Sequence, residues 1–249
     1  MYKNDLKRAF QLRKMCIGCI GIVFVMFFSI YKMTNVTSVY RAYTDAIYFI
    51  PFMMSMTFCA IPFGRTITED IEHEYYYMLL LRERIGKYVV SKVIVTYISA
   101  IVTMFIGVLI FVALIRVRVP WEESIVVEDA LLNILGGTTY GILYFCIHSI
   151  YMGLLAGNLI VISIGVSLLW SDKLLQISMP FMLYYLLIYY SGELFPNTPQ
   201  LNIQFMFNPS YNTWNDVKVS FVFPFVFSLM VASIMGGYIY KQLNKRDGK

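Results

Sequence analysis

The sequence predicts an all-α integral membrane protein with six transmembrane helices and both termini in the cytoplasm. Of the 249 residues, 59% are hydrophobic and 14% are charged, whereas an ordinary soluble domain has about 25% charged residues. Six charge-free runs reach the length of about 17–25 residues with which a helix crosses the hydrocarbon core. Lysine and arginine gather in three segments, and this asymmetry predicts the orientation. A soluble or disordered chain is excluded.

The charge-free runs hold 17, 19, 23, 42, 19 and 22 residues. They are residues 15–31, 46–64, 93–115, 130–171, 174–192 and 219–240. Backbone amides in lipid have no water partner, so each run is expected to form helix. None shows the alternation of a membrane β-barrel strand. The expected spans are 15–31, 46–64, 93–115, 174–190 and 219–240, with one more from the longest run.

The basic segments are residues 1–14, 65–92 and 241–249, which together hold 14 of the 20 lysines and arginines. Cytoplasmic segments are enriched in these residues, so all three are expected on the cytoplasmic side. Two termini on one side require an even number of spans. Residues 192–218, with three prolines and several asparagines, are then an extracellular loop.

The 42-residue run permits two arrangements. In the first, an interfacial piece at 131–137 precedes one long, tilted span to residue 170, and Asp172 and Lys173 form a cytoplasmic turn. In the second, the run is a hairpin that turns at 153–158, and residues 179–190 re-enter the membrane from outside. The first is preferred because two charged residues make the better aqueous turn.

Residues 4–14 combine apolar Leu6 and Phe10 with four basic residues. This pattern suits a short helix at the cytoplasmic membrane surface, with its cations near anionic headgroups. An ordinary basic flank of the first span is the alternative.

Residues 65–92 are expected to contain an amphipathic cytoplasmic helix that begins at Thr68. Acidic residues in its first turn and basic residues near its end complement the helix dipole: Glu69, Asp70, Glu72, Arg82 and Arg84. Acidic residues are repelled by anionic lipid, so this helix is predicted to contact a protein partner.

The stretch PFGRTITEDIEHEYYYMLLLRERIGKYVVSK resembles the cytoplasmic loop of the permease subunits of type-2 ATP-binding-cassette (ABC) exporters. The residues that match are Glu69, Asp70, Glu72, Arg82, Lys87, Tyr88, Ser91 and Lys92. Two later stretches, Met179-Pro180-Phe181 and Asn208-Pro209-Ser210, also resemble the family, whereas Glu74 stands where the family often has glycine.

The resemblance implies one transmembrane permease domain over residues 1–249, with 65–92 as the ATPase-coupling loop and 1–14 as the connecting helix. It implies two partners, an ATP-binding subunit that holds ATP and Mg²⁺ and a second permease subunit, in the plasma membrane of a prokaryote. The chain has no phosphate-binding loop of the G-x-x-x-x-G-K-[ST] type and binds no cofactor itself. Partners are therefore protein and membrane lipid, with no nucleic acid.

The expected function is export of a peptide, a lipid-linked molecule or an amphiphile. The alternative is an integral-membrane enzyme acting on lipids or peptides, which needs a cluster of catalytic groups at membrane depth. The expected spans contain one histidine, His148, and no acidic residue. An ionisable residue within the membrane is a candidate polar site, although a neutral histidine bonded to a neighbouring helix is equally consistent. The four cysteines lie in apolar runs and are expected to pack there.

Overall fold

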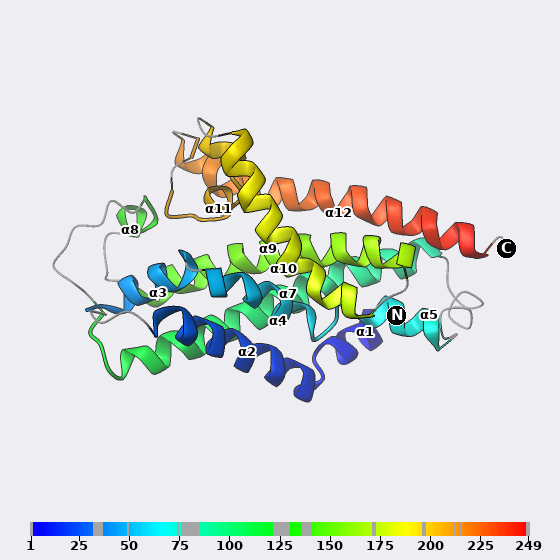
Figure 1. Cartoon of the computed structure of the whole chain (residues 1–249), viewed down its shortest axis with the longest axis horizontal. Coiled ribbons are helices and arrows are strands. Elements are labelled where there is room, and N and C mark those ends of the chain that lie inside the picture. The colour runs from blue at the N-terminus through cyan, green and yellow to red at the C-terminus, as the bar shows by residue number, and fades with distance from the viewer. Residues whose placement is uncertain are drawn as a thin grey trace.

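A computed structural model describes residues 2–31, 37–48, 50–73, 75, 85–121, 130–135, 141–170, 173–195, 198–211, 213–214 and 216–247. These residues form helices and turns without any strand, so the all-α prediction is confirmed for them. Long helices follow the long axis of the molecule, and α10 (Lys173–Leu194) crosses them obliquely (Figure 1).

Four helices are long and apolar enough to cross a membrane. They are α2 (Leu12–Ile30), α7 (Ile85–Arg116), α9 (Gly141–Trp170) and α12 (Val217–Asp247). The shortest has 19 residues, or about 29 Å at 1.5 Å per residue, which matches a hydrocarbon core of about 30 Å. Four of the six expected spans therefore lie in helices with the properties of membrane spans.

The expected second and fifth spans differ from these four. Residues 46–64 are divided between the end of α3 (Val39–Tyr48), the 3-10 helix η1 (Ile50–Met53) and α4 (Met54–Ala60). Residues 174–190 lie in α10, which has 22 residues but is not among the four helices above. The described residues thus form a helical protein with four candidate membrane spans, compared with the six that were expected.

The 42-residue run contains one long helix. After the short α8 (Ala130–Ile134), α9 continues for 30 residues without a turn at 153–158. The turn that the hairpin arrangement requires at 153–158 is therefore absent, and residues 141–170 form one helix, as the long-span arrangement predicts for this part of the run. The glycines of that stretch serve packing instead, because a Cβ on Gly153 would lie 2.6 Å from the Cα of Ile101, and one on Gly157 would lie 2.5 Å from the ring of Tyr97. Small residues at these positions let α9 approach α7 closely.

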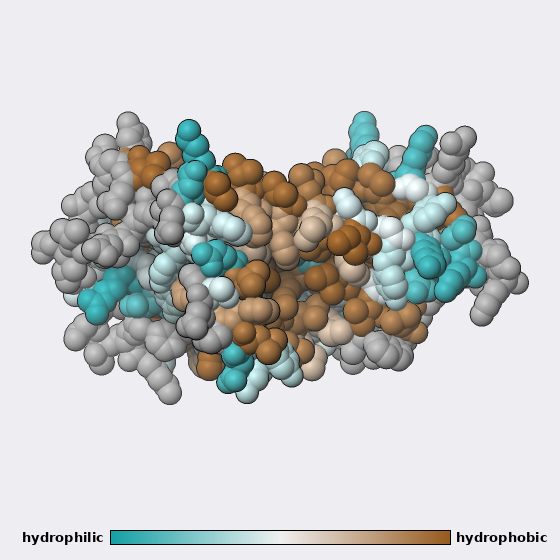
Figure 2. Space-filling model, turned by 90° about the horizontal axis from the view of Figure 1, so that it is seen from above, coloured by the Kyte–Doolittle hydropathy of each residue, from teal (hydrophilic) through white to brown (hydrophobic). Residues whose placement is uncertain are grey.

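The core lies around α9. In its most apolar stretch 83% of the residues are buried, compared with 11% in α12. Hydrophobic side chains also gather on the outer surface over the middle of the long axis, with hydrophilic residues toward both ends (Figure 2). A water-soluble protein would cover this middle zone with polar groups, so its surface is typical of a protein surrounded by lipid.

The two chain ends lie at the same end of the molecule, together with α1 (Tyr2–Ala9) and α5 (Thr66–Glu72) (Figure 1). The helices α3 and α8 lie at the opposite end. The helical conformation is interrupted at Phe10 and Gln11, between α1 and α2. The N-terminal segment is therefore a helix of its own and not a simple flank of the first span.

Residues 192–218 are more ordered than expected. The segment contains the end of α10, the short helices η3 (Pro199–Leu201) and α11 (Ile203–Met206), and the start of α12. Phe207 is fully buried within it. Apolar side chains directed inward pack this segment onto the bundle, which the prolines and asparagines alone did not indicate.

Candidate functional site

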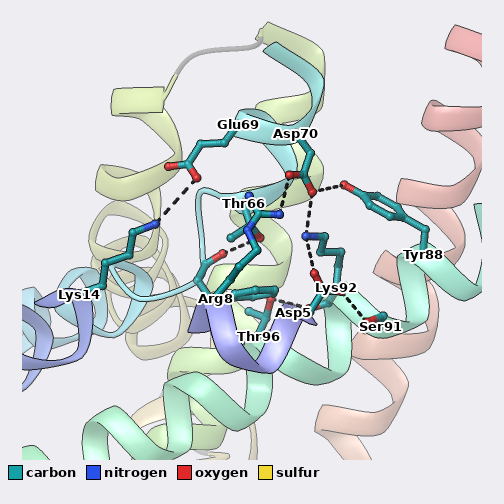
Figure 3. Close-up of polar contacts among 11 residues, drawn as sticks. Asp5, Arg8, Lys14, Thr66, Glu69, Asp70, Tyr88, Ser91, Lys92 and Thr96 are labelled. Carbon is teal, nitrogen blue, oxygen red and sulfur yellow. Dashed lines mark hydrogen bonds and ion pairs between the residues drawn. The ribbon is translucent and has the colours of Figure 1, made fainter. Parts of the chain in front are cut away.

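Helices α1, α5 and α7 meet around a buried lysine at the end of the molecule that holds both termini (Figure 3). The Lys92 Nζ atom lies 2.9 Å from Asp5 Oδ1 and 2.8 Å from Asp70 Oδ2. The exposed fractions of these three side chains are 0%, 6% and 1%. One ammonium group therefore joins carboxylates from two other helices in a place that water does not reach.

Both carboxylates have further partners. Ser91 Oγ donates a hydrogen bond of 2.6 Å to Asp5, and the Tyr88 hydroxyl donates one of 3.0 Å to Asp70. The guanidinium of Arg8 donates to Asp70 at 2.7 Å. The charge network, as we call this group, consists of Asp5, Arg8, Asp70, Tyr88, Ser91 and Lys92. Its two cations balance its two anions, as buried ions require if they are to avoid a large desolvation cost.

Residue spacing places these groups together. Asp5 and Arg8 are three residues apart and share one face of α1, while Tyr88, Ser91 and Lys92 have the i, i+3, i+4 spacing of one face of α7. The Lys92 ammonium also lies over an aromatic ring of Phe63, 5.1 Å from its centroid. The ring adds a cation–π attraction to the ammonium group.

Arg8 is held as a cation by its surroundings. Burial disfavours its charge, but the hydrogen bond to Asp70 and the attraction of Asp70, Asp5 and Glu69 outweigh burial and raise the Arg8 pKa above its ordinary value. Arg8 therefore stays cationic throughout the physiological pH range.

A second set of contacts fastens α5 to α9 and α10. The Thr68 hydroxyl donates to Gln176 Oε1, and Gln176 Nε2 donates to the carbonyl of Gly64, both at 2.5 Å. Ser163 Oγ of α9 donates to the Gln176 carbonyl at 2.7 Å. Since Gln176 is buried, these bonds are protected from water. Helix α5 is consequently connected to three long helices, α7, α9 and α10.

The expected helix start is wrong. Helix α5 begins at Thr66, its N-cap residue Arg65 makes no side-chain capping bond, and Thr68 is engaged with Gln176 instead. A polar partner from another helix has displaced the local capping role that the sequence suggested.

The three acidic residues of α5 separate into two kinds. Asp70 is internal and is paired with Arg8 and Lys92. Glu69 is 26% exposed, with its carboxylate 3.9 Å from Lys14 Nζ, and Glu72 is exposed. Arg82 and Arg84, also expected in the coupling helix, lie outside the described residues.

His148, the other candidate, lies apart from the charge network. Its imidazole is 2% exposed, and Nε2 lies 2.8 Å from the hydroxyl of Ser210, which is also 3.1 Å from the Tyr144 hydroxyl. These bonds connect α9 to the segment that follows α11. The imidazole is thus hydrogen-bonded within the chain, but its partner Ser210 lies in a turn and not in a neighbouring helix. Among the described residues, no group of three histidine, cysteine or acidic side chains could hold a metal ion.

Comparisons with protein-family models, with curated proteins and with solved structures found no match to this chain.

Sequence reasoning missed Asp5. It is the one acidic residue among the first 14, and a single acid in a basic helix is a signal of an internal partner. Lys92, in contrast, was among the residues that match the exporter motif, together with Tyr88 and Ser91.

Proposed function

We propose that the chain is the membrane-spanning subunit of an ABC exporter, driven by a separate ATPase. The observation that carries the proposal is the charge network, which fastens the helix after the second expected span to the N-terminal helix and to the third span. A loop that merely connects two spans has no need of buried ions. A helix that must transmit force to the spans does need a stiff connection.

In this proposal α5 receives the motion of the ATPase. Glu69 and Glu72 on its accessible side contact the partner, and Asp70 on its inner side transfers the displacement to Lys92 of α7. Helix α7 has 32 residues and is about 48 Å long, so a shift at its cytoplasmic end reaches the opposite side of the membrane. The contacts through Gln176 pass the same motion to α9 and α10. Packed, rigid helices that have two arrangements are the physical basis of such coupling.

The complete span count is also part of the proposal. Helix α10, at about 33 Å, is the fifth span, and the broken helix α3–η1–α4 forms the second. Both termini are cytoplasmic, which agrees with their common location at one end of the molecule. Two such subunits form a twelve-span pathway, and the ATPase subunits hold ATP and Mg²⁺. The substrate is a peptide, a lipid-linked molecule or another amphiphile.

Purification of the tagged chain from its native membrane tests this function. We expect a second polypeptide with a phosphate-binding loop to co-purify and to hydrolyse ATP. Replacing the Walker lysine of that polypeptide should abolish transport and leave the complex intact. A chain that purifies from mild detergent with no ATPase, and that turns over a lipid or peptide alone, would contradict the proposal and support the membrane-enzyme alternative.

A further inference from the structure

A hollow of about 380 Å³ opens on the outer surface between α7 and α12. Its lining is almost wholly apolar and includes Val89, Val93 and Ile94 from α7 and Leu229, Ala232 and Tyr240 from α12. Ile94 and Leu229 are 44% and 69% exposed. The groove therefore faces whatever surrounds the bundle, which for a membrane protein is the acyl-chain region.

Small residues keep the groove open. Ser233, Gly236 and Gly237 of α12 and Gly86 of α7 also line it. A Cβ placed on Gly86 or Gly237 would meet no atom within 4 Å, and one on Gly236 would only touch Val93 at 4.0 Å. The glycines are thus not required for close packing. They leave a space that nothing in the described residues fills.

The length of the groove along α12 is about the thickness of one lipid leaflet. On α12 its lining extends from Leu229 to Tyr240, which is about 16 Å along the helix axis. The hydrocarbon core is about 30 Å thick, so this length is roughly half of it. The C-terminal end of α12 lies at the end of the molecule that holds both termini (Figure 1), where the interface with water is expected.

Cations follow directly at that end. Lys241 and Lys245 are exposed and come one and five residues after Tyr240 on α12. Lys241 comes four residues after Gly237, which lines the groove, and so lies one helical turn beyond it on the same side of α12. Lysines at this level attract anionic headgroups.

We propose that the groove binds an anionic phospholipid of the leaflet at the terminal end of the molecule. One acyl chain lies along Val93, Ala232 and Gly237, and the headgroup phosphate contacts Lys241 and Lys245. A second copy of this chain is a poorer occupant. In a two-fold interface each copy presents the same surface to the other, so the lysines of both would meet at one level.

Native mass spectrometry of the full chain tests the site. The protein is purified in detergent with equal amounts of phosphatidylglycerol and phosphatidylcholine, and the bound lipids are counted. We expect the wild type to retain phosphatidylglycerol preferentially. Replacing both lysines (K241Q/K245Q) should lower the preference by roughly fivefold for each lysine. Lys218→Gln, an exposed lysine at the opposite end of α12, is the matched control and should leave it unchanged.

A groove-filling variant gives an independent test. Gly237→Leu puts a side chain into open space and improves helix propensity, so it should fold. It should lose both lipids, whereas the lysine variant loses only the preference for anionic ones. Equal lipid retention by wild type and G237L would overturn the proposal. So would a G237L protein that changes from dimer to monomer, since that result assigns the groove to a second copy. The site does not depend on the proposed transport function, because no ATPase enters the measurement.

Discussion

Replacing Lys92 with methionine is expected to destabilise the protein by about 3–5 kcal/mol, the usual cost of removing one partner from a buried ion pair. Asp5 would keep its hydrogen bond from Ser91, and Asp70 would keep its contacts with Arg8 and Tyr88. Thermal unfolding of the detergent-solubilised protein measures the effect as a lower melting temperature.

Two further variants make this result specific. Lys218→Met removes an exposed lysine at the start of α12, and surface changes of this kind usually stay within about 0.5 kcal/mol. Adding Asp5→Asn to K92M removes the carboxylate that has lost its cation, so the double variant should regain part of the stability, about 0.5–3 kcal/mol of coupling. If K92M and K218M melted together, Lys92 would not be the centre of a buried network.

Replacing both Glu69 and Glu72 with lysine (E69K/E72K) reverses the charge at two positions of α5. We expect this change to weaken ATPase binding and leave the fold intact. Neither carboxylate is buried, and the Lys14 contact of Glu69 is an exposed pair worth about 0.2–1 kcal/mol. At both positions, a carboxylate that we expect to attract a cation of the ATPase becomes a lysine that repels it. A combined effect of about 1–2 kcal/mol corresponds to a factor of roughly 5–30 in the binding constant. Co-purification of the ATPase from membranes and substrate-stimulated ATP hydrolysis measure it.

Glu193→Lys is the matched control, because Glu193 is exposed near the end of α10, away from α5 in Figure 1. It changes the net charge of the chain at a place where no ATPase is expected. E193K should therefore retain the ATPase at the level of wild type. A loss of ATPase in E193K equal to that in E69K/E72K would point to a general charge effect instead of a contact of α5.

Much of the fold could be predicted because hydrophobic length and charge are local properties of the sequence. The runs 15–31, 93–115 and 219–240 each lie almost wholly within one long helix. The second run could not be resolved in this way, because its division into α3, η1 and α4 depends on tertiary packing. Its length alone is also compatible with one straight helix. The same limit applies to α9, whose central glycines fit either a turn or close contact with α7.

The candidate site was predicted only in part. A helix in this loop was predicted from its residues, although it begins at Thr66 and not at Thr68. Tyr88, Ser91 and Lys92 were identified only through the resemblance to the exporter loop. The burial of Asp70 did not, because it depends on Arg8 and Lys92 arriving from distant parts of the chain. Thr68 illustrates the same point, since it has the residue type and position of a cap but finds a better partner in Gln176.

The proposed function requires contact between the exposed side of α5 and an ATPase. Photo-crosslinking tests this contact most directly: a p-benzoylphenylalanine is placed at Glu72, and at Glu193 for comparison, and native membranes are irradiated. We expect the Glu72 variant to form an adduct with a polypeptide that carries a phosphate-binding loop, and the Glu193 variant to form none. Adducts with lipid alone at position 72, or an ATPase adduct at position 193, would contradict it.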